Sequence, residues 1–156
     1  MNKRMIVSPL IIPEPLRPSD KIAIASPSGA VKPVLIDALV QLLADAGFAP
    51  VVMPHAKERL GSYSASQADR FADMASAVAD RTIRAIMCAR GGYGAVHLIP
   101  SLESLSLRAN AKWLIGFSDI SALHALWSSY GIASIHGPMA RHLTAVSYTH
   151  LRAHET

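Results

Sequence analysis

The sequence predicts an α/β domain with an open, mostly parallel sheet that is flanked by helices. Short apolar runs alternate along the chain with segments whose apolar residues recur at helical spacing, the pattern of parallel strands joined by crossover helices. Turn-forming residues follow most of the apolar runs. Hydrophobic residues make up 51% of the 156 residues and charged residues only 17%, which suits strands that are covered on both faces.

The first elements are a strand and an amphipathic helix. We expect a buried strand over 21–25, which the turn 26–29 ends. Apolar residues then recur on one helical face from Val31 to Ala46. Gly47 stands where a C-terminal glycine cap belongs, so the helix is expected to end there.

The same alternation continues to the end of the expected domain. A second strand is expected over 48–53, then a loop over 55–64. The next helix covers 67–78, with Phe71, Met74, Ala75 and Val78 facing inward. The remaining expected elements are strands at 83–88, 112–117 and 132–135, and helices at 93–99, ended by Pro100, and at 120–130.

Three loops of this arrangement share one edge of the sheet. They are residues 26–29, 90–94 and 117–119, and each follows an expected strand. The carboxyl ends of parallel strands lie together, and open α/β sheets bind their ligands at that edge. Catalytic or binding residues are therefore expected in these loops.

The most specific pattern lies at the end of the fourth expected strand. The apolar run 113–117 leads directly into Ser118, and a helix begins at once. A serine on such a tight turn projects its hydroxyl above the sheet, while the helix N-terminus offers N–H groups to an oxyanion. The second glycine of the usual Gly-x-Ser-x-Gly is absent, because Ile120 stands there. Ser118 or Asp119 could instead only cap the helix, so both interpretations stay open.

The glycine-rich loop 90–94 is the second feature. Its glycines let the backbone approach a ligand and present N–H groups, as an oxyanion donor or an anion cradle would. A tight strand-to-helix turn is the structural alternative. No Gly-Lys-Ser/Thr follows, so the loop is not a phosphate-binding P-loop. The turn 26–29 could line a pocket in the same way, with a plain turn as its alternative.

A serine nucleophile needs a base within hydrogen-bond reach. The histidines that could serve are His55, His97, His124, His136 and His142. His136 stands at the end of an expected strand, so we expect it to be a pocket residue; a structural or surface role is the alternative for each histidine. Cys88, beside the glycine-rich loop, is expected to be a small buried residue rather than a nucleophile.

Composition excludes several classes of protein. The net charge of +4 comes from scattered Lys and Arg residues, without the basic stripe typical of nucleic-acid binding. No histidine pair has zinc-ligand spacing, and one cysteine builds neither a disulfide nor a thiolate metal site. Pro9 and Pro13 interrupt the N-terminal apolar stretch, so no signal peptide or membrane span is expected. We expect a cytoplasmic protein with no metal, cofactor, nucleic-acid or membrane partner.

Four segments, taken together and in order, resemble the LD-carboxypeptidase family, which includes the microcin self-immunity peptidases. The segments are 16–24 with 26–29, then 89–94, 112–120 and 136–139. The resemblance covers about residues 10–143 and implies a flavodoxin-like or class I glutamine-amidotransferase-like N-terminal domain, with the family's C-terminal domain absent. We therefore expect one nucleophile-bearing domain over residues 1–144. Residues 145–156 lack core periodicity and resemble foreign read-through sequence, so a non-native tail is expected.

The resemblance also implies roles for particular residues. Ser118 matches the nucleophile of a Ser-His-Glu triad, and the backbone N–H groups of Asp119 and Gly92 are expected to form the oxyanion hole. The family's triad glutamate and histidine lie on its C-terminal domain, so no residue here is assigned to them; His136 matches a different family motif. The substrate-binding candidates are Ser28, Arg90, Gly91, Tyr93 and His136.

The implied reaction is hydrolysis of the amide bond to a terminal D-amino acid, such as the D-alanine of a murein tetrapeptide in peptidoglycan recycling. A microcin-like peptide is the other implied substrate, and the full-length protein is expected to be a homodimer. Because Ser118 without a base is a weak nucleophile, the sequence as it stands is expected to be inactive. Two other functions stay open: a serine esterase or thioesterase, and a non-catalytic small-molecule-binding domain of flavodoxin-like architecture.

Overall fold

Parallel strands form the centre of the molecule. The structure is a computed structural model that describes residues 9–145, and its five-stranded sheet has the order β2-β1-β3-β4-β5. Every neighbouring pair of strands is parallel, which confirms the predicted open sheet and puts all the carboxyl ends along one edge. The strands are β1 (Lys21–Ala25), β2 (Ala49–Val52), β3 (Ile83–Cys88), β4 (Trp113–Gly116) and β5 (Ile135–His136).

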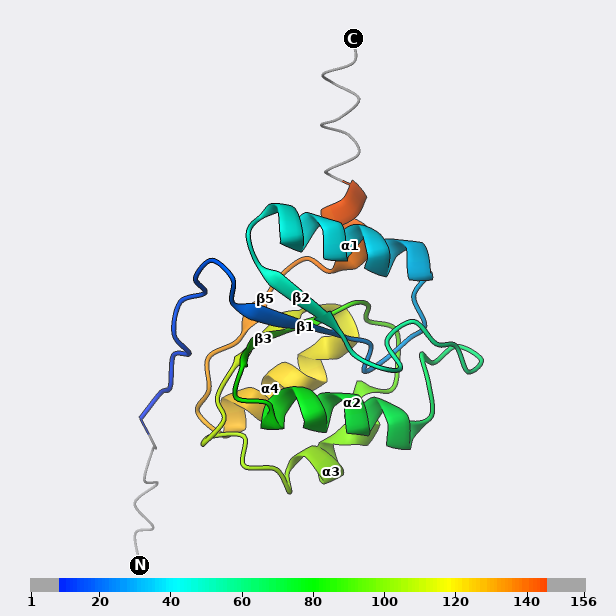
Figure 1. Cartoon of the computed structure of the whole chain (residues 1–156). Coiled ribbons are helices and arrows are strands. Elements are labelled where there is room, and N and C mark those ends of the chain that lie inside the picture. Colours follow the sequence, from blue (N-terminus) through cyan, green and yellow to red (C-terminus); the bar gives the residue numbers. More distant parts are fainter. Residues whose placement is uncertain (1–8, 146–156) are drawn as a thin grey trace, which may run out of the picture.

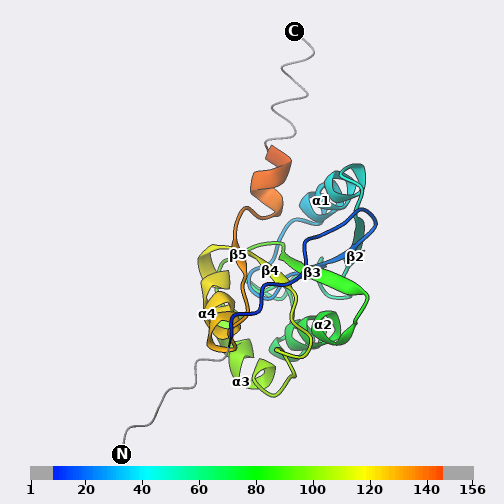
Figure 2. The ribbon, with the colours of Figure 1, turned by 90° about the vertical axis from the view of Figure 1, so that its left-hand side faces the viewer.

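Helices cover both faces of this sheet. Figures 1 and 2 show α1 on one face and α2, α3 and α4 on the other. Right-handed crossovers require this division, because the chain moves outward from β1 to β2 and then returns past β1 to β3. The numbered helices are α1 (Pro33–Asp45), α2 (Gln67–Ala79), α3 (Ile99–Leu102) and α4 (Ser121–Ser129), with the 3₁₀ turns η1 (Ala95–Leu98) and η2 (Ser118–Ile120). Residues 140–145 are helical as well.

The reversal of direction creates a switch point between β1 and β3. The loop after β1 leads to α1 on one face, whereas the loop after β3 leads to η1 and α3 on the other. Because the two loops diverge, they leave a crevice at the carboxyl edge, which is where doubly wound sheets bind ligands. The candidate site lies there.

The two central strands and the helices packed on them form the core. Ile24 of β1 and Ile86 of β3 are fully buried, and so are Leu39 of α1 and Met74 of α2. On the α4 side the core includes Trp127, which is 1% exposed. Burying one such large apolar side chain contributes about 1.5–3 kcal/mol. The core therefore fixes the strands, and the strands fix the places where the loops emerge.

Most element boundaries differ from the sequence-based expectation by a residue or two, and two differ in kind or by more. Pro100 lies in the first turn of α3 instead of ending a helix, because the N–H that proline lacks has no helical partner in a first turn anyway. The last strand covers Ile135–His136 rather than 132–135, and Ile132 instead pairs with Ile11 in an isolated bridge. The predicted tail, except for its first residue, lies outside the described residues.

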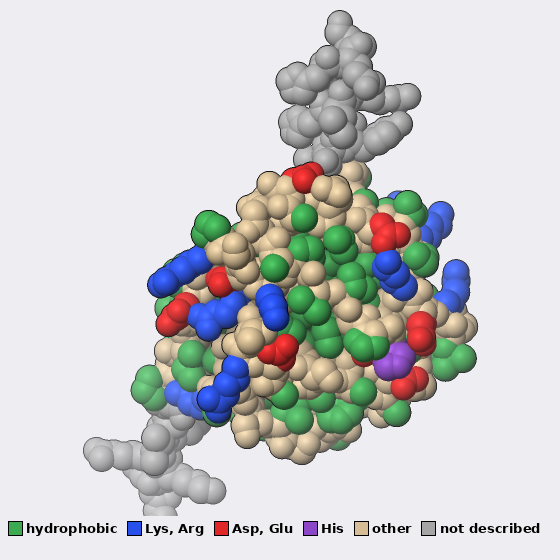
Figure 3. Space-filling model, viewed as in Figure 1, with side chains coloured by type: hydrophobic (Ala, Val, Ile, Leu, Met, Phe, Trp, Pro, Cys, Tyr) green, Lys and Arg blue, Asp and Glu red, His purple; other side chains and the backbone are tan. Residues whose placement is uncertain are grey.

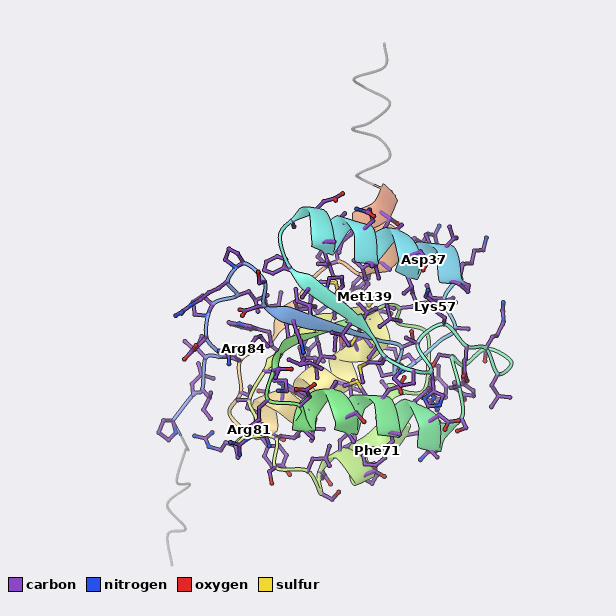
Figure 4. All side chains as sticks on the ribbon, viewed as in Figure 1. Asp37, Lys57, Phe71, Arg81, Arg84 and Met139 are labelled. Atoms are coloured by element: carbon purple, nitrogen blue, oxygen red, sulfur yellow. The ribbon has the colours of Figure 1, made fainter. Side chains whose placement is uncertain are left out.

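The buried face of α2 was predicted only in part. Met74 and Val78 are buried as expected, but Ala75 is only half-buried, and Phe71 is half-buried on the side of α2 next to α3 (Figure 4). Two polar residues, Arg70 and Asp73, are buried in its place. Both have hydrogen-bond partners inside the protein, which offsets the free-energy cost of removing them from water.

The loop between β2 and α2 is attached to the helices on both faces. The backbone N–H of His55 donates to Asp73 Oδ2 (3.0 Å), and the ring Nδ1 of His55 lies 2.8 Å from Asp73 Oδ1. Lys57 pairs with Asp37 of α1 (Figure 4). The hydrogen bond to Asp73 raises the pKa of His55 above its ordinary value, and desolvation opposes that rise only in part.

Charged side chains are interspersed over the surface in view. Figure 3 shows Lys and Arg next to Asp and Glu, with hydrophobic side chains between them. This distribution agrees with the scattered basic residues in the sequence. Separately, none of the helices within residues 9–145 has both the length and the apolar run that a membrane crossing needs.

The His55–Asp73 contact gives a pH-dependent contribution to stability. Because folding raises the pKa of His55, this contribution is complete below the ordinary value of 6.5 and is lost as the pH rises through the higher folded-state value. We expect His55→Gln to lower the urea midpoint more at about pH 5.5 than at about pH 8.5. The control is His97→Gln, since the His97 ring contacts the Tyr93 hydroxyl and forms no ion pair with a carboxylate of residues 9–145. An equal loss at both pH values for His55→Gln would contradict a charged pair.

Candidate active site

Ser118 occupies a bend that presents its side chain at the carboxyl edge of the sheet. It comes one residue after β4 and begins η2, which leads into α4. Its φ is 62°, in the left-handed region that residues with a side chain rarely adopt. The residue is exposed to solvent. A strained, exposed serine between a strand and a helix is the geometry of a nucleophile elbow.

The side chain of Asp119 connects this bend to two other loops. Its Oδ2 accepts a 2.6 Å hydrogen bond from Ser28 Oγ, which lies in the loop after β1 and is fully buried. The same oxygen accepts a 2.9 Å hydrogen bond from the N–H of Ala95, at the end of the glycine-rich loop. Hydrogen bonds to a carboxylate are stronger than those between neutral groups. One carboxylate therefore ties together the loops after β1, β3 and β4.

The glycine-rich loop packs directly against Ser118. A methyl group added at Gly91 would lie 3.0 Å from Ser118 Cβ and 3.2 Å from Ser118 Oγ. The carbonyl of Gly91 accepts a 3.0 Å hydrogen bond from the N–H of Gly29, which joins the loop to the turn after β1. Gly92 has a φ of 111°, a conformation open mainly to glycine. Because Gly91 has no side chain, the loop can lie close to Ser118. Because Gly92 tolerates a positive φ, the backbone of the loop can turn there.

The backbone N–H groups of Asp119 and Gly92 are the candidate donors to a ligand at this edge of the sheet. A methyl group at Gly91 would lie 3.4 Å from Asp119 N, so this amide borders the glycine-rich loop. Within residues 9–145, neither Asp119 N nor Gly92 N donates a hydrogen bond to another protein group. Free N–H groups at the start of a helical segment are suited to accept an anion. These are the two donors that the sequence-based interpretation assigned to an oxyanion hole.

A pocket of about 810 Å³ opens beside Ser118. Its apolar lining residues come from the first turn of α1 and the segment just before it, from the residue after β4 and from the segment after β5; they include Val31, Val34, Leu35, Phe117 and Met139. Its other lining residues include Lys32, Arg90, Arg141 and His142, and no Asp or Glu lines it among the described residues. The positive charge favours a ligand that carries an anionic group.

The structure brings some of the predicted binding residues to the pocket and leaves others apart. Arg90 and Gly91 line it, and the guanidinium of Arg90 also donates to the carbonyl of Ala30. Tyr93 is 59% exposed and its hydroxyl lies 3.3 Å from His97 Nε2, away from the pocket lining. Ser28 is buried beneath the surface and reaches Asp119 instead of the pocket.

The histidines occupy different environments. His136 is exposed near the ring of Phe117, with 6.0 Å between ring centroids, but it is not among the pocket-lining residues. His142 does line the pocket, and its ring meets Phe117 edge-on at 5.0 Å. His124 lies 2.7 Å from Ser134 Oγ and 2.8 Å from the Gly116 carbonyl, so both of its ring nitrogens have partners. Within the described residues, no histidine is hydrogen-bonded to Ser118.

Cys88 is unsuited to act as a nucleophile. Its side chain at the end of β3 is fully buried, and this burial raises the pKa of the thiol to about 12. The reactive thiolate is therefore negligible at neutral pH. Among residues 9–145, no group of three or more His, Cys, Asp or Glu side chains is arranged to hold a metal ion.

Three residues of the site had no clear basis in the sequence. The sequence suggests only a helix cap for the Asp119 carboxylate, yet this group is the acceptor that joins the loops. His142 was one of five candidate histidines without a reason to prefer it. The sequence analysis assigns no role to Arg70, which is 3% exposed and contacts the loops around Ser118. The one available indication was its place on α2, four residues before the buried Met74.

The sequence matches a protein-family model over most of the described chain. Residues 22–137 match Peptidase S66, described as the LD-carboxypeptidase N-terminal domain. A curated relative from Streptomyces coelicolor is 36% identical over 153 residues, which cover 92% of this chain and 49% of the relative. The murein tetrapeptide carboxypeptidase of Pseudomonas aeruginosa is 32% identical over 121 residues, which cover 77% of this chain and 39% of that protein.

Solved structures agree in fold. An MccF-like protein from Bacillus anthracis is 29% identical with a TM-score of 0.77, over 86% of this chain and 42% of that one. The microcin C7 self-immunity protein MccF, solved with aspartyl sulfamoyl adenosine, is 27% identical with a TM-score of 0.75, over 84% of this chain and 40% of that one. The chain thus spans half or less of the length of these relatives. By its sequence match and its fold, this chain belongs to the LD-carboxypeptidase family, Peptidase S66.

Proposed function

We propose that this chain carries the nucleophile of a serine-type LD-carboxypeptidase that removes a terminal D-amino acid, such as D-alanine, from a murein tetrapeptide. The observation that carries the proposal is the exposed, left-handed Ser118 packed against Gly91 at the mouth of a pocket with positive charge. The name of the Pseudomonas aeruginosa relative, murein tetrapeptide carboxypeptidase, supports this choice of substrate.

The proposed chemistry uses the groups in the order of a serine peptidase. Ser118 Oγ attacks the carbonyl carbon of the last amide bond and gives its proton to a base. The N–H groups of Asp119 and Gly92 bind the oxyanion that forms, and one such donor is worth about 10²–10³ in rate. The D-amino acid leaves with the proton from the base, and water then hydrolyses the acyl-enzyme. The positive pocket lining favours a substrate that ends in a free carboxylate.

The base and its carboxylate partner are proposed to come from a part of the family protein that this chain does not span. His124 is occupied by Ser134 and the Gly116 carbonyl, and His55 is held by Asp73, so neither is free to serve Ser118. By the same resemblance, we propose that the complete enzyme is a cytoplasmic homodimer that acts in peptidoglycan recycling.

The 156-residue chain alone is expected to release no D-alanine from a murein tetrapeptide above the rate of a blank reaction. The reason is that a serine without a base remains a poorly nucleophilic alcohol. Released D-alanine can be measured with a D-amino acid oxidase assay. Rapid turnover by the chain alone would contradict this prediction and would point to a base within it, with His142 of the pocket lining as the first candidate.

Joining residues 1–143 to the C-terminal half of the Streptomyces coelicolor relative is expected to restore hydrolysis of the tetrapeptide. In this chimera, Ser118→Ala should lower kcat by at least about 10³-fold, because the attacking oxygen is gone. The matched control is Ser121→Ala, an exposed serine one turn further along the same helical segment.

The same assay separates the proposed substrate from its alternatives. A chimera that cleaves an aminoacyl sulfamoyl adenosine but no tetrapeptide would favour a self-immunity peptidase, and cleavage of simple esters alone would favour an esterase. Full tetrapeptide activity in the Ser118→Ala chimera would contradict the proposed nucleophile.

Gly91→Ala in the chimera tests the close approach of the glycine-rich loop. The added methyl group would lie 3.0 Å from Ser118 Cβ, so we expect the serine to shift and kcat to fall by about 10²-fold. Gly47→Ala is the control for lost stability, because its methyl group meets no atom within 4 Å but strains a backbone with a φ of 91°. Equal activity of the two variants would show that the contact between Gly91 and Ser118 has no role.

A further inference from the structure

Arg70 is a buried cation that contacts the loops around Ser118. It lies on α2 and is 3% exposed, and no Asp or Glu oxygen lies within 4.0 Å of it among the described residues. Burying a charge without a paired carboxylate is unfavourable unless hydrogen bonds satisfy its donors. A buried arginine in such a place therefore indicates that its hydrogen bonds hold something in position.

The guanidinium donates three hydrogen bonds, to backbone carbonyls of three different segments. Arg70 Nη1 donates to Pro27 O at 2.7 Å and to Gly94 O at 3.1 Å, and Arg70 Nε donates to Ala65 O at 3.1 Å. Its Cζ also lies 4.8 Å from the centre of the Tyr63 ring, within the range of a cation–π interaction. The planar fork of arginine suits this arrangement, because lysine has one terminal nitrogen and cannot replace donors at both Nε and Nη1.

Two of these carbonyls belong to the residues that immediately precede the donors to Asp119. Pro27 precedes Ser28, whose Oγ donates to Asp119 Oδ2, and Gly94 precedes Ala95, whose N–H donates to the same oxygen. Arg70 thus holds the loops after β1 and β3. Each of its two contacts lies one residue before the group that bonds to Asp119, the residue that follows Ser118.

Gly94 makes room for this contact. A methyl group added there would lie 2.9 Å from Arg70 Nη1 and 2.9 Å from Tyr63 Cε1. The last glycine of the loop therefore serves Arg70, while Gly91 serves Ser118. The glycine-rich loop is held between the nucleophile on one side and the arginine on the other.

We propose that Arg70 is a positioning residue for the catalytic serine: by holding Pro27 and Gly94, it fixes Ser28 and Ala95 on Asp119 and so maintains the bend at Ser118. The effect on catalysis rests on the proposed function. The structural link, by which we mean the contacts from Arg70 through the two loops to Asp119, does not. Arg70 does not line the pocket and is proposed to act only through Asp119.

Hydrogen exchange of the 156-residue chain tests the structural link without any activity. In Arg70→Met, which keeps much of the apolar stem and removes every donor, the Ala95 amide should exchange at least about tenfold faster, while the amides of Ile24 and Ile86 keep their protection. Arg70→Lys keeps the charge but not the fork, so it should also expose the Ala95 amide. The matched control is Arg84→Met, which removes an exposed arginine paired with Glu14 away from this edge (Figure 4).

Three results would overturn the proposal. The first is unchanged protection of Ala95 in a folded Arg70→Met chain. The second is a uniform loss of protection across β1 and β3 in both Arg70 variants, which would make Arg70 only a stability residue. The third is an Arg70→Lys chain that protects Ala95 as well as wild type.

In the chimera, Arg70→Lys should lower kcat at least about tenfold with little change in KM. If the Ser118→Ala chimera keeps its activity while the Ala95 amide exchanges faster in Arg70→Met, the proposed function is wrong and the structural link is still supported.

Discussion

The left-handed backbone of Ser118 is the constraint on which the site depends. A residue with a side chain pays about 1–2 kcal/mol for this conformation, so the surrounding structure must hold it there. The carboxylate of the next residue provides the means, because Asp119 accepts hydrogen bonds from Ser28 and Ala95. Bonds to a charged acceptor contribute about 1.5–3 kcal/mol each, enough to offset the strain. The result is an exposed hydroxyl at a fixed place beside Gly91.

The sheet topology explains why three distant segments meet at that place. Parallel strands deliver the loops after β1, β3 and β4 to one edge, and the reversal between β1 and β3 leaves a crevice there. Each loop contributes a different group. The loop after β1 contributes the buried hydroxyl of Ser28, the loop after β3 contributes its glycines, and the loop after β4 contributes the strained Ser118. Arg70 adds a connection from α2 beneath the first two loops. The site is thus held from the side of the core, while the pocket side stays open to a ligand.

Sequence reasoning was successful where the relevant forces are local. Helical and strand periodicity predicted the order of the elements, and the direct passage from an apolar strand through Gly116 to Ser118 predicted the bend. It failed where a residue's role depends on partners far away in the chain. Arg70 is a charged residue on an amphipathic helix, so its composition suggests a solvated face, and only three distant carbonyls make its burial favourable. His142 lines the pocket because it lies on the helical segment 140–145 after β5, where the sequence analysis expected no element.

The most direct measurement is the difference in free energy of unfolding between Ser118→Gly and Ser118→Ala in the 156-residue chain. Both variants lack the hydroxyl, so their difference reports the backbone alone and needs no base or substrate. A left-handed residue at this position predicts that the glycine variant is more stable by about 1 kcal/mol. If the position were an ordinary right-handed helical residue, alanine would be the more stable by a similar amount, about 1 kcal/mol. That reversed order would contradict the strained elbow from which the proposed catalytic role of Ser118 derives.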